Sequence, residues 1–117
     1  MITGIGLDIT ELQRVRRLDK KSPKFRERVL TDRELAEYAL LSEKRKTEFL
    51  AGRFAAKEAF AKANGTGIGK ACSFQDIEIR KDSNGKPGIY FQQLETGLVS
   101  ITHTKEYAAA QVLLQSN

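Results

Sequence analysis

The segment from Ser42 to Asn64 constrains the fold most, because it predicts one long helix in a chain of only 117 residues. Gly65 is typical of the left-handed residue that ends a helix. At 100° per residue, the apolar side chains gather on one broad face. That face consists of Phe49, Leu50, Phe54, Ala56, Phe60, Ala61 and Ala63. We expect this helix to pack on a sheet.

Two charged residues share another side of the helix. Glu58 and Lys62 are one turn apart and lie directly beyond Ala51 and Ala55. These small side chains leave space beside the carboxylate and the ammonium, as a pocket wall would. An exposed ion pair worth about a few tenths of a kcal/mol explains the same spacing.

Residues 2–9 alternate as a strand does. One face carries Ile5, Leu7 and Ile9, and the other carries Gly4, Gly6 and Asp8. Two carboxylates together with phosphate oxygens form the oxygen-rich site that Mg²⁺ prefers, so Asp8 and Glu58 are candidate ligands. A lone aspartate in a strand is often a turn or capping residue instead, and the spacing does not show whether the two meet.

Two capping boxes predict helix starts, at Thr10–Gln13 and at Thr31–Glu34. In the first helix Leu12 and Val15 face inward, and Pro23 interrupts the helix or follows its end. Its other side carries a basic stripe of Arg14, Arg17 and Lys21. In the second helix Leu35, Tyr38 and Leu41 are spaced for burial on one face.

The second half of the chain changes to a period of two residues. Strands are predicted at residues 77–80 and 89–91 around the turn signal Asp82–Gly85, and at 98–102 and 107–114 around His103–Glu106. Helices therefore dominate the first half and antiparallel strands the second. We predict an α+β fold in a single domain, residues 1–117, with the sheet packed against the long helix.

The chain has 20 basic and 15 acidic residues, and the formal charge of +5 points to an anionic partner: nucleic acid, a phosphate-rich ligand or an acidic protein. No apolar run would span a membrane, a signal peptide is not expected, and Cys72 is the single cysteine, which suits the cytoplasm.

The glycines of residues 65–69 do not form a phosphate loop, because the sequence has Asn64 and Ala71 where that motif needs glycine and a hydroxyl. They fit a helix stop and a tight turn that a ligand can approach closely. His103, the only histidine, is either structural or a ligand-binding group.

Four segments, taken in order, resemble the holo-acyl-carrier-protein synthases, the small bacterial phosphopantetheinyl transferases. They are GIGLDITEL, RFAAKEAFAKA with GTGIG, FQDIEI followed by NGKP, and VSITHTKEYAAAQVLL. The resemblance covers nearly the whole chain. It implies transfer of the 4′-phosphopantetheine arm of coenzyme A to a serine of apo acyl carrier protein, with release of adenosine 3′,5′-bisphosphate. It also implies a role in fatty acid biosynthesis in the cytoplasm.

The resemblance assigns roles to residues of this chain. Asp8 and Glu58 would hold Mg²⁺, Lys62 would contact the diphosphate, and Glu58 would take the serine proton directly or through a metal-bound water. The nucleotide end of coenzyme A, with its 3′-phosphate, would meet Arg53, Gly65, Asn84, Gly85, Lys86, Pro87 and His103. The carrier protein would meet Arg14, Arg17 and Lys21.

Family members form trimers whose active sites are shared between neighbouring subunits, so the resemblance also implies a homotrimer. It implies neither a nucleic acid nor a membrane as partner. Phe54 stands where family members often have tryptophan, and Thr102 stands where they often have serine. The competing hypothesis is a basic module without catalytic activity that binds RNA or an acidic protein.

Overall fold

The computed structural model describes residues 1–116 and confirms the α+β fold. The helical half consists of strand β1 (Ile2–Glu11) and helices α1 (Leu12–Lys21), α2 (Lys24–Val29), α3 (Asp32–Ala39) and α4 (Glu43–Ala63). After a 3₁₀ turn η1 (Phe74–Asp76) come strands β2 (Ile77–Lys81), β3 (Pro87–Phe91), β4 (Leu94–Glu95), β5 (Leu98–His103) and β6 (Tyr107–Gln115). The long helix and both hairpins lie where the sequence predicts them.

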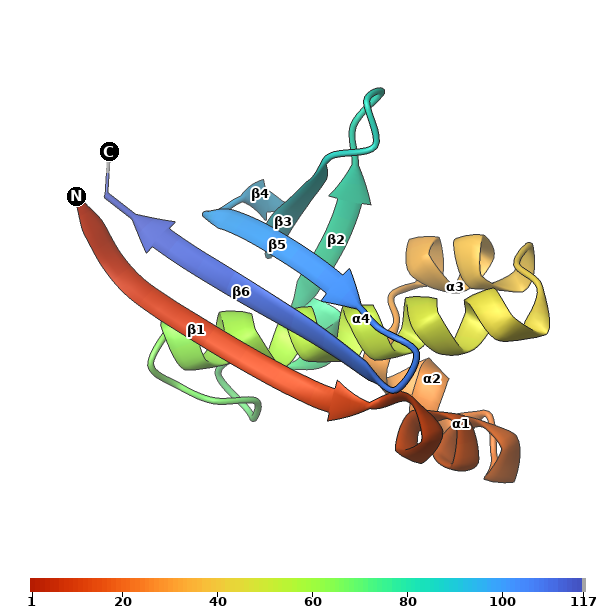
Figure 1. Cartoon of the computed structure of the whole chain (residues 1–117). Coiled ribbons are helices and arrows are strands. Elements are labelled where there is room, and N and C mark those ends of the chain that lie inside the picture. Colours follow the sequence, from red (N-terminus) through yellow and green to blue (C-terminus); the bar gives the residue numbers. More distant parts are fainter. Residues whose placement is uncertain (117) are drawn as a thin grey trace.

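The strands form two antiparallel sheets of three strands, with the orders β1-β6-β5 and β2-β3-β4. The first and last long strands of the chain pair with each other, from Ile2 opposite Gln115 to Glu11 opposite Tyr107. Figure 1 shows α4 running behind the β1-β6-β5 sheet, with the start of β1 and the end of β6 side by side at one end. The backbone N–H of Ser116 donates to the carbonyl of Met1 at 2.9 Å.

Helix α4 is buried around most of its circumference, so the expectation of a single apolar face beside a charged side is too simple. One core cluster packs Ala55 and Phe60 against both sheets, and a second packs Leu50 and Ala51 against α1 and the end of α2. Ala51 and Ala55 are completely buried. The prediction that they form a pocket wall is therefore wrong, because neighbouring elements fill the space beside them.

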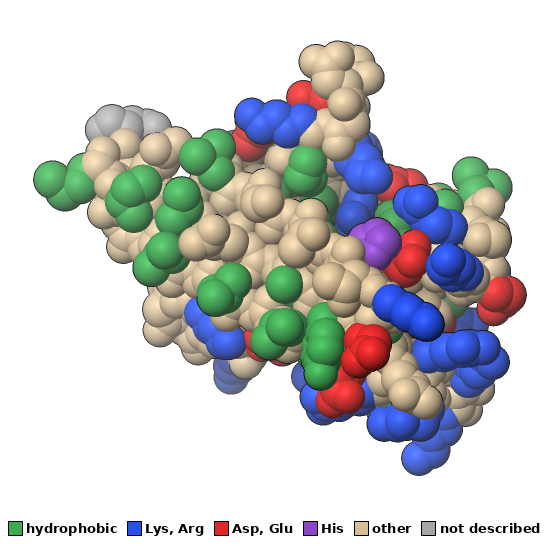
Figure 2. Space-filling view, viewed as in Figure 1, with side chains coloured by type: hydrophobic (Ala, Val, Ile, Leu, Met, Phe, Trp, Pro, Cys, Tyr) green, Lys and Arg blue, Asp and Glu red, His purple; other side chains and the backbone are tan. Residues whose placement is uncertain are grey.

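Glycines allow β1 to lie directly against α4. A Cβ atom on Gly6 would stand 1.8 Å from the carbonyl oxygen of Ala59, and one on Gly4 would stand 2.2 Å from that of Ala63. The predicted alternation of the strand is confirmed, and the glycine face is the one that points at the helix. The apolar face points away from it, so Ile5, Leu7 and Ile9 are 61–64% exposed. Figure 2 shows hydrophobic side chains spread along the open face of the sheet.

Of the two predicted capping boxes, only the second is present. The Thr31 hydroxyl accepts from the backbone N–H of Glu34, and the Glu34 carboxylate accepts from that of Thr31. Thr10 instead lies buried within β1, opposite Ala108. Pairing with β6 continues to Glu11, so the strand takes the residues that the capping box would have used and α1 begins without a side-chain cap.

The other local predictions agree with the structure. Helix α1 ends before Pro23, and Tyr38 is buried while Leu35 and Leu41 are partly buried. In the β2–β3 turn the Asp82 carboxylate accepts from the backbone N–H groups of Asn84 and Lys86. No helix among residues 1–116 is both long enough and apolar enough to cross a membrane.

Candidate active site

Strand β1 and the C-terminal half of α4 bring three of the predicted residues together. The Lys62 ammonium donates to Asp8 Oδ1 at 3.1 Å and to the carbonyl oxygen of Leu7 at 3.1 Å. Asp8 points toward the helix because it shares the glycine face of β1, and its side chain is 16% exposed. Glu58 precedes Lys62 by one helical turn. The alternative of a Glu58–Lys62 ion pair is thus not realised, because Lys62 pairs with Asp8 rather than with Glu58.

The charge of Asp8 acts on the Glu58 carboxyl. Burial, and next the negative charge of Asp8, raise the pKa of Glu58 above its ordinary value, and the charges of Lys62 and Arg28 oppose that rise. Two anions held close together in a partly buried site attract a cation of higher charge. The electrostatics of this cluster therefore fit a divalent metal as well as an ammonium.

The donor set also fits Mg²⁺ in kind and number. Among residues 1–116 no group of three or more His, Cys, Asp or Glu side chains could hold a metal by itself. Mg²⁺ is commonly bound through one or two carboxylates, with the remaining positions left to water and substrate phosphates. Asp8 and Glu58 offer such an incomplete set, which suits a metal that binds together with a phosphate ligand.

Arg28 is a neighbour of Glu58 that sequence reasoning missed. It lies on α2, its charge acts on the Glu58 carboxyl, and its guanidinium stands 5.5 Å above the ring of Phe74. Phe74 in turn stacks on Phe54, at 5.7 Å between ring centroids. No short-range pattern links Arg28 to Glu58, because they lie 30 residues apart in the chain, with the whole of α3 between them.

A buried ion pair fixes α4 next to this cluster. Lys57 is completely buried, and its ammonium donates to Glu34 Oε1 at 2.6 Å and to the carbonyl oxygens of Val29 and Phe74. The second oxygen of Glu34 accepts from the backbone N–H of Ile79. A signal for this pair existed in the sequence, because at 100° per residue Lys57 falls within the apolar face of the helix.

The residues predicted to bind the nucleotide lie elsewhere on the molecule. His103 is exposed, and its Nδ1 stands 3.8 Å from Glu48 Oε2, an ion pair when the imidazole is protonated. Glu48 lies ten residues before Glu58 on α4, which is about 15 Å along the helix axis. His103 is therefore not brought to the Asp8–Glu58 cluster within one chain, and its exposure does not fit a histidine in the core.

Arg53 is a buried cation without its full set of partners. Its side chain is 6% exposed, its guanidinium covers the ring of Phe49 at 4.2 Å, and Glu37 is 3.9 Å away. Its Nε and one terminal nitrogen donate no hydrogen bond to any described residue. Burial lowers the pKa of Arg53, although Glu34 and Glu37 oppose that change. A buried guanidinium with free donors is suited to an anion that reaches it from outside.

The two loops predicted to meet the ligand are both exposed. Gly65 adopts φ +82° and ends α4 as expected, with space open around it. The turn at Asn84–Pro87 lies at the far end of the β2–β3 hairpin, where Lys86 and Pro87 line a cavity of about 350 Å³. Neither belongs to the same cavity as His103.

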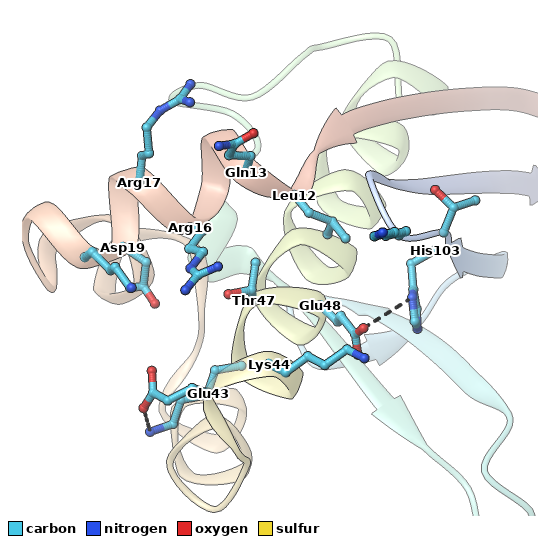
Figure 3. Close-up of a pocket in the computed structure, with 14 residues that line it drawn as sticks. Leu12, Gln13, Arg16, Arg17, Asp19, Glu43, Lys44, Thr47, Glu48 and His103 are labelled. Atoms are coloured by element: carbon cyan, nitrogen blue, oxygen red, sulfur yellow. Dashed lines mark ion pairs between the residues drawn. The ribbon is translucent and has the colours of Figure 1, made fainter.

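His103 lines a larger cavity of about 1050 Å³ between α1, the start of α4 and the β5–β6 turn. Figure 3 shows Glu48 and His103 facing each other on one side of it, with Arg16 and Arg17 on α1 opposite. Arg14, Arg17 and Lys21 are all exposed. Figure 2 shows the Lys and Arg side chains gathered at this end of the molecule.

Cys72 is completely buried, and burial raises the pKa of its thiol. A thiol in that state is a poor nucleophile.

Comparison with known proteins connects this arrangement to one family. The family model described as "4'-phosphopantetheinyl transferase superfamily" matches residues 4–112. The holo-[acyl-carrier-protein] synthase of Bacillus subtilis is 65% identical over 117 residues, with 98% of this chain and 97% of that protein covered. A crystal structure of a holo-(acyl-carrier-protein) synthase from Bacillus anthracis in complex with CoA (3′,5′-ADP) has a TM-score of 0.93 and 51% identity, and covers 100% of this chain and 99% of that one. The enzyme of Helicobacter pylori in complex with coenzyme A has a TM-score of 0.83 and 34% identity, with 95% and 99% covered. The chain belongs to the holo-[acyl-carrier-protein] synthase family of 4′-phosphopantetheinyl transferases.

Proposed function

We propose that this protein transfers the 4′-phosphopantetheine group of coenzyme A to a serine of apo acyl carrier protein, with Mg²⁺ as cofactor. The observation that supports the proposal best is the ion pair of Lys62 with Asp8 where β1 lies against α4, together with the charges of both residues acting on Glu58. This cluster combines two carboxylates that can hold a metal with an ammonium that can reach a phosphate.

The reaction exchanges one phosphorus–oxygen bond for another. The serine oxygen forms a bond to the phosphorus that carries the pantetheine arm, the bond to the bridging diphosphate oxygen breaks, and adenosine 3′,5′-bisphosphate leaves with the electron pair. Mg²⁺, held by Asp8 and Glu58, would neutralise the charge that develops on the phosphate groups.

The chain's own residues supply the remaining steps. Glu58 accepts the serine proton, for which its raised pKa suits it better than an ordinary carboxylate. Lys62 donates to the diphosphate and offsets its negative charge, as a compact ammonium can. Arg28 adds positive charge on the α2 side of Glu58.

We also propose that the active site is completed by a neighbouring subunit in a homotrimer. Arg53, His103 and the turn at Asn84–Pro87 would then bind the nucleotide of a coenzyme A whose diphosphate lies on the neighbour's Asp8 and Glu58. The separation of the two groups within one chain supports this arrangement. The exposed apolar face formed by Ile5, Leu7 and Ile9 supports it as well, because a subunit contact would cover it.

We propose that the carrier protein docks on the basic stripe of α1, formed by Arg14, Arg17 and Lys21, because the family resemblance implies an acidic carrier protein. Exposed charges of this kind mainly accelerate encounter. We further propose that the reaction serves fatty acid biosynthesis in the cytoplasm, which the family resemblance implies.

A transfer assay tests the proposal. The protein is incubated with coenzyme A, Mg²⁺ and an apo acyl carrier protein, and the carrier is weighed by mass spectrometry. We expect the carrier to gain the mass of phosphopantetheine, and a carrier whose acceptor serine is replaced by alanine to gain none. An unchanged mass with a carrier that another transferase modifies would overturn the proposal and favour a basic binding module.

A further inference from the structure

The contacts of Lys62 resemble those of a bound cation. Its ammonium lies between a carboxylate oxygen of Asp8 and the carbonyl oxygen of Leu7, both at 3.1 Å. Oxygen atoms of these two kinds are also the usual neighbours of hard metal ions in proteins. The Lys62 side chain is 53% exposed, so it can rotate away without opening the core.

From this geometry we infer that Lys62 is a built-in competitor of the metal, holding the Asp8 carboxylate until the diphosphate of coenzyme A draws the ammonium away. This inference rests on the proposed function and adds an order to it. In the free protein the ammonium already neutralises one of the two carboxylates. A divalent ion that arrives alone must displace it, or bind next to a positive charge.

The diphosphate changes this balance. It offers Lys62 a new anionic partner, so Asp8 is released while phosphate oxygens become available to the metal. Metal and coenzyme A therefore bind cooperatively, and part of that cooperativity passes through Lys62. Thermodynamic linkage requires the effect to be reciprocal: the metal must raise the affinity for coenzyme A by the same factor.

Binding of Mn²⁺ as a spectroscopic substitute for Mg²⁺ tests the inference without any turnover. Electron paramagnetic resonance of free Mn²⁺ gives its affinity for the wild type and for Lys62→Met, with and without coenzyme A. Met keeps most of the side-chain length but removes the charge. We expect Lys62→Met to bind Mn²⁺ alone at least about tenfold more tightly than the wild type does, and to gain less affinity from coenzyme A.

Lys24→Met is the matched control. Lys24 is exposed on α2, and its side chain is in none of the ion pairs among residues 1–116. Its replacement by Met removes one positive charge, as Lys62→Met does. If both variants change Mn²⁺ affinity equally, or if neither changes it, the inference is overturned. Circular dichroism and thermal melting of both variants show that the fold is kept.

The same proteins, run in the transfer assay, separate this inference from the proposed function. A wild type that modifies the carrier while Lys62→Met binds Mn²⁺ no more tightly than Lys24→Met would overturn only the competitor role. A wild type that leaves the carrier unmodified but shows the expected Mn²⁺ series would keep the competitor role and overturn the proposed reaction.

Discussion

At the scale of single residues, Glu58 carries a charge that the folded protein holds at a cost. Its pKa is raised by burial and by Asp8, so the ionised form is less favourable in the folded state than in the unfolded chain. The contribution of Glu58 to the stability of the fold is therefore fully present below the unfolded pKa, near 4.5, and is lost as pH rises through the higher folded pKa. A residue retained against this cost is typical of a functional site.

Glu58→Gln should consequently separate stability from activity. The substitution preserves volume but removes the charge that repels Asp8, so we expect the melting temperature at pH 7 to rise by roughly 1–4 °C, with the difference shrinking toward pH 4. Transfer should fall at least about 100-fold, because the proton acceptor and a metal ligand are both lost. Calorimetry and the mass assay measure the two effects. Glu11→Gln, an exposed change on β1, is the control, and a lower melting temperature for Glu58→Gln would contradict the explanation.

Lys57 shows the opposite case, in which a charge is essential to the fold. Burial lowers its pKa, and the contact with Glu34 opposes that change. Lys57→Met would leave Glu34 buried without its cation, so we expect unfolding in urea to require about 3–5 kcal/mol less free energy. The double variant Lys57→Met/Glu34→Gln should lose less free energy of unfolding than the two single variants lose in sum. Simple additivity in that double-mutant cycle would show that the two residues do not interact.

These residues mark what a sequence can and cannot reveal about the site. The side-by-side placement of Glu58 and Lys62 follows from helix geometry alone. Their meeting with Asp8 depends on β1 packing against α4, which is a contact between segments about 50 residues apart. The family resemblance supplied that connection, and it remains the source of the nucleotide assignments. Lys57 was overlooked because its partners come from three other elements.

At the scale of elements, the packing of β1 on α4 sets the position of Asp8. Gly6→Ala would place a Cβ atom 1.8 Å from the Ala59 carbonyl, and neither backbone can give way cheaply. We expect a loss of at least about 3 kcal/mol in the free energy of unfolding, or no folding at all. Gly69→Ala is the matched control, because that position has open space and should be neutral or slightly stabilising. Denaturation curves of both variants decide the point, and a well-folded Gly6→Ala would refute the close approach.

Local signals explain which elements were predictable. The start of α4, its glycine stop and the β2–β3 turn are encoded within a few residues, and all three are where the sequence places them. The Thr10 box failed because strand pairing with β6, nearly 100 residues away, competes for the same backbone. The division of the strands into two sheets is likewise a long-range property, which no local pattern contains.

The positive charge of Arg14 on helix α1 should act mainly on the rate of association with the carrier protein. Arg14→Glu reverses one charge of the exposed basic stripe, so we expect association with the carrier protein to slow and its dependence on salt to weaken. The rate constants come from surface plasmon resonance at several salt concentrations. Lys81→Glu, an equal charge change on β2, serves as the control. If Arg14→Glu alters binding no more than Lys81→Glu does, the stripe is not the docking surface.

At the scale of the whole molecule, the exposed apolar face and the divided site have one common explanation. The chain leaves Ile5, Leu7 and Ile9 open to water, and it keeps His103 about three helical turns from Glu58. Both features suit a chain that assembles with further copies of itself. Leu7 is at once on the apolar face and, through its carbonyl, in contact with Lys62. The proposed subunit contact and the proposed active site are therefore neighbours in the fold.

Mixing inactive subunits tests whether the site is shared. Glu58→Gln lacks one half of the proposed site and His103→Ala lacks the other, so each homotrimer should transfer poorly. Coexpression of the two in equal amounts should restore activity, because about one quarter of the sites would join an intact Glu58 to an intact neighbouring His103. Glu58→Gln mixed with Asp8→Asn is the decisive control, since the charge of Asp8 acts on Glu58 within one chain and no mixture of these variants places both carboxylates in one subunit. Recovery in the first mixture but not in the second requires a site between subunits, whereas recovery in neither would assign each site to a single chain.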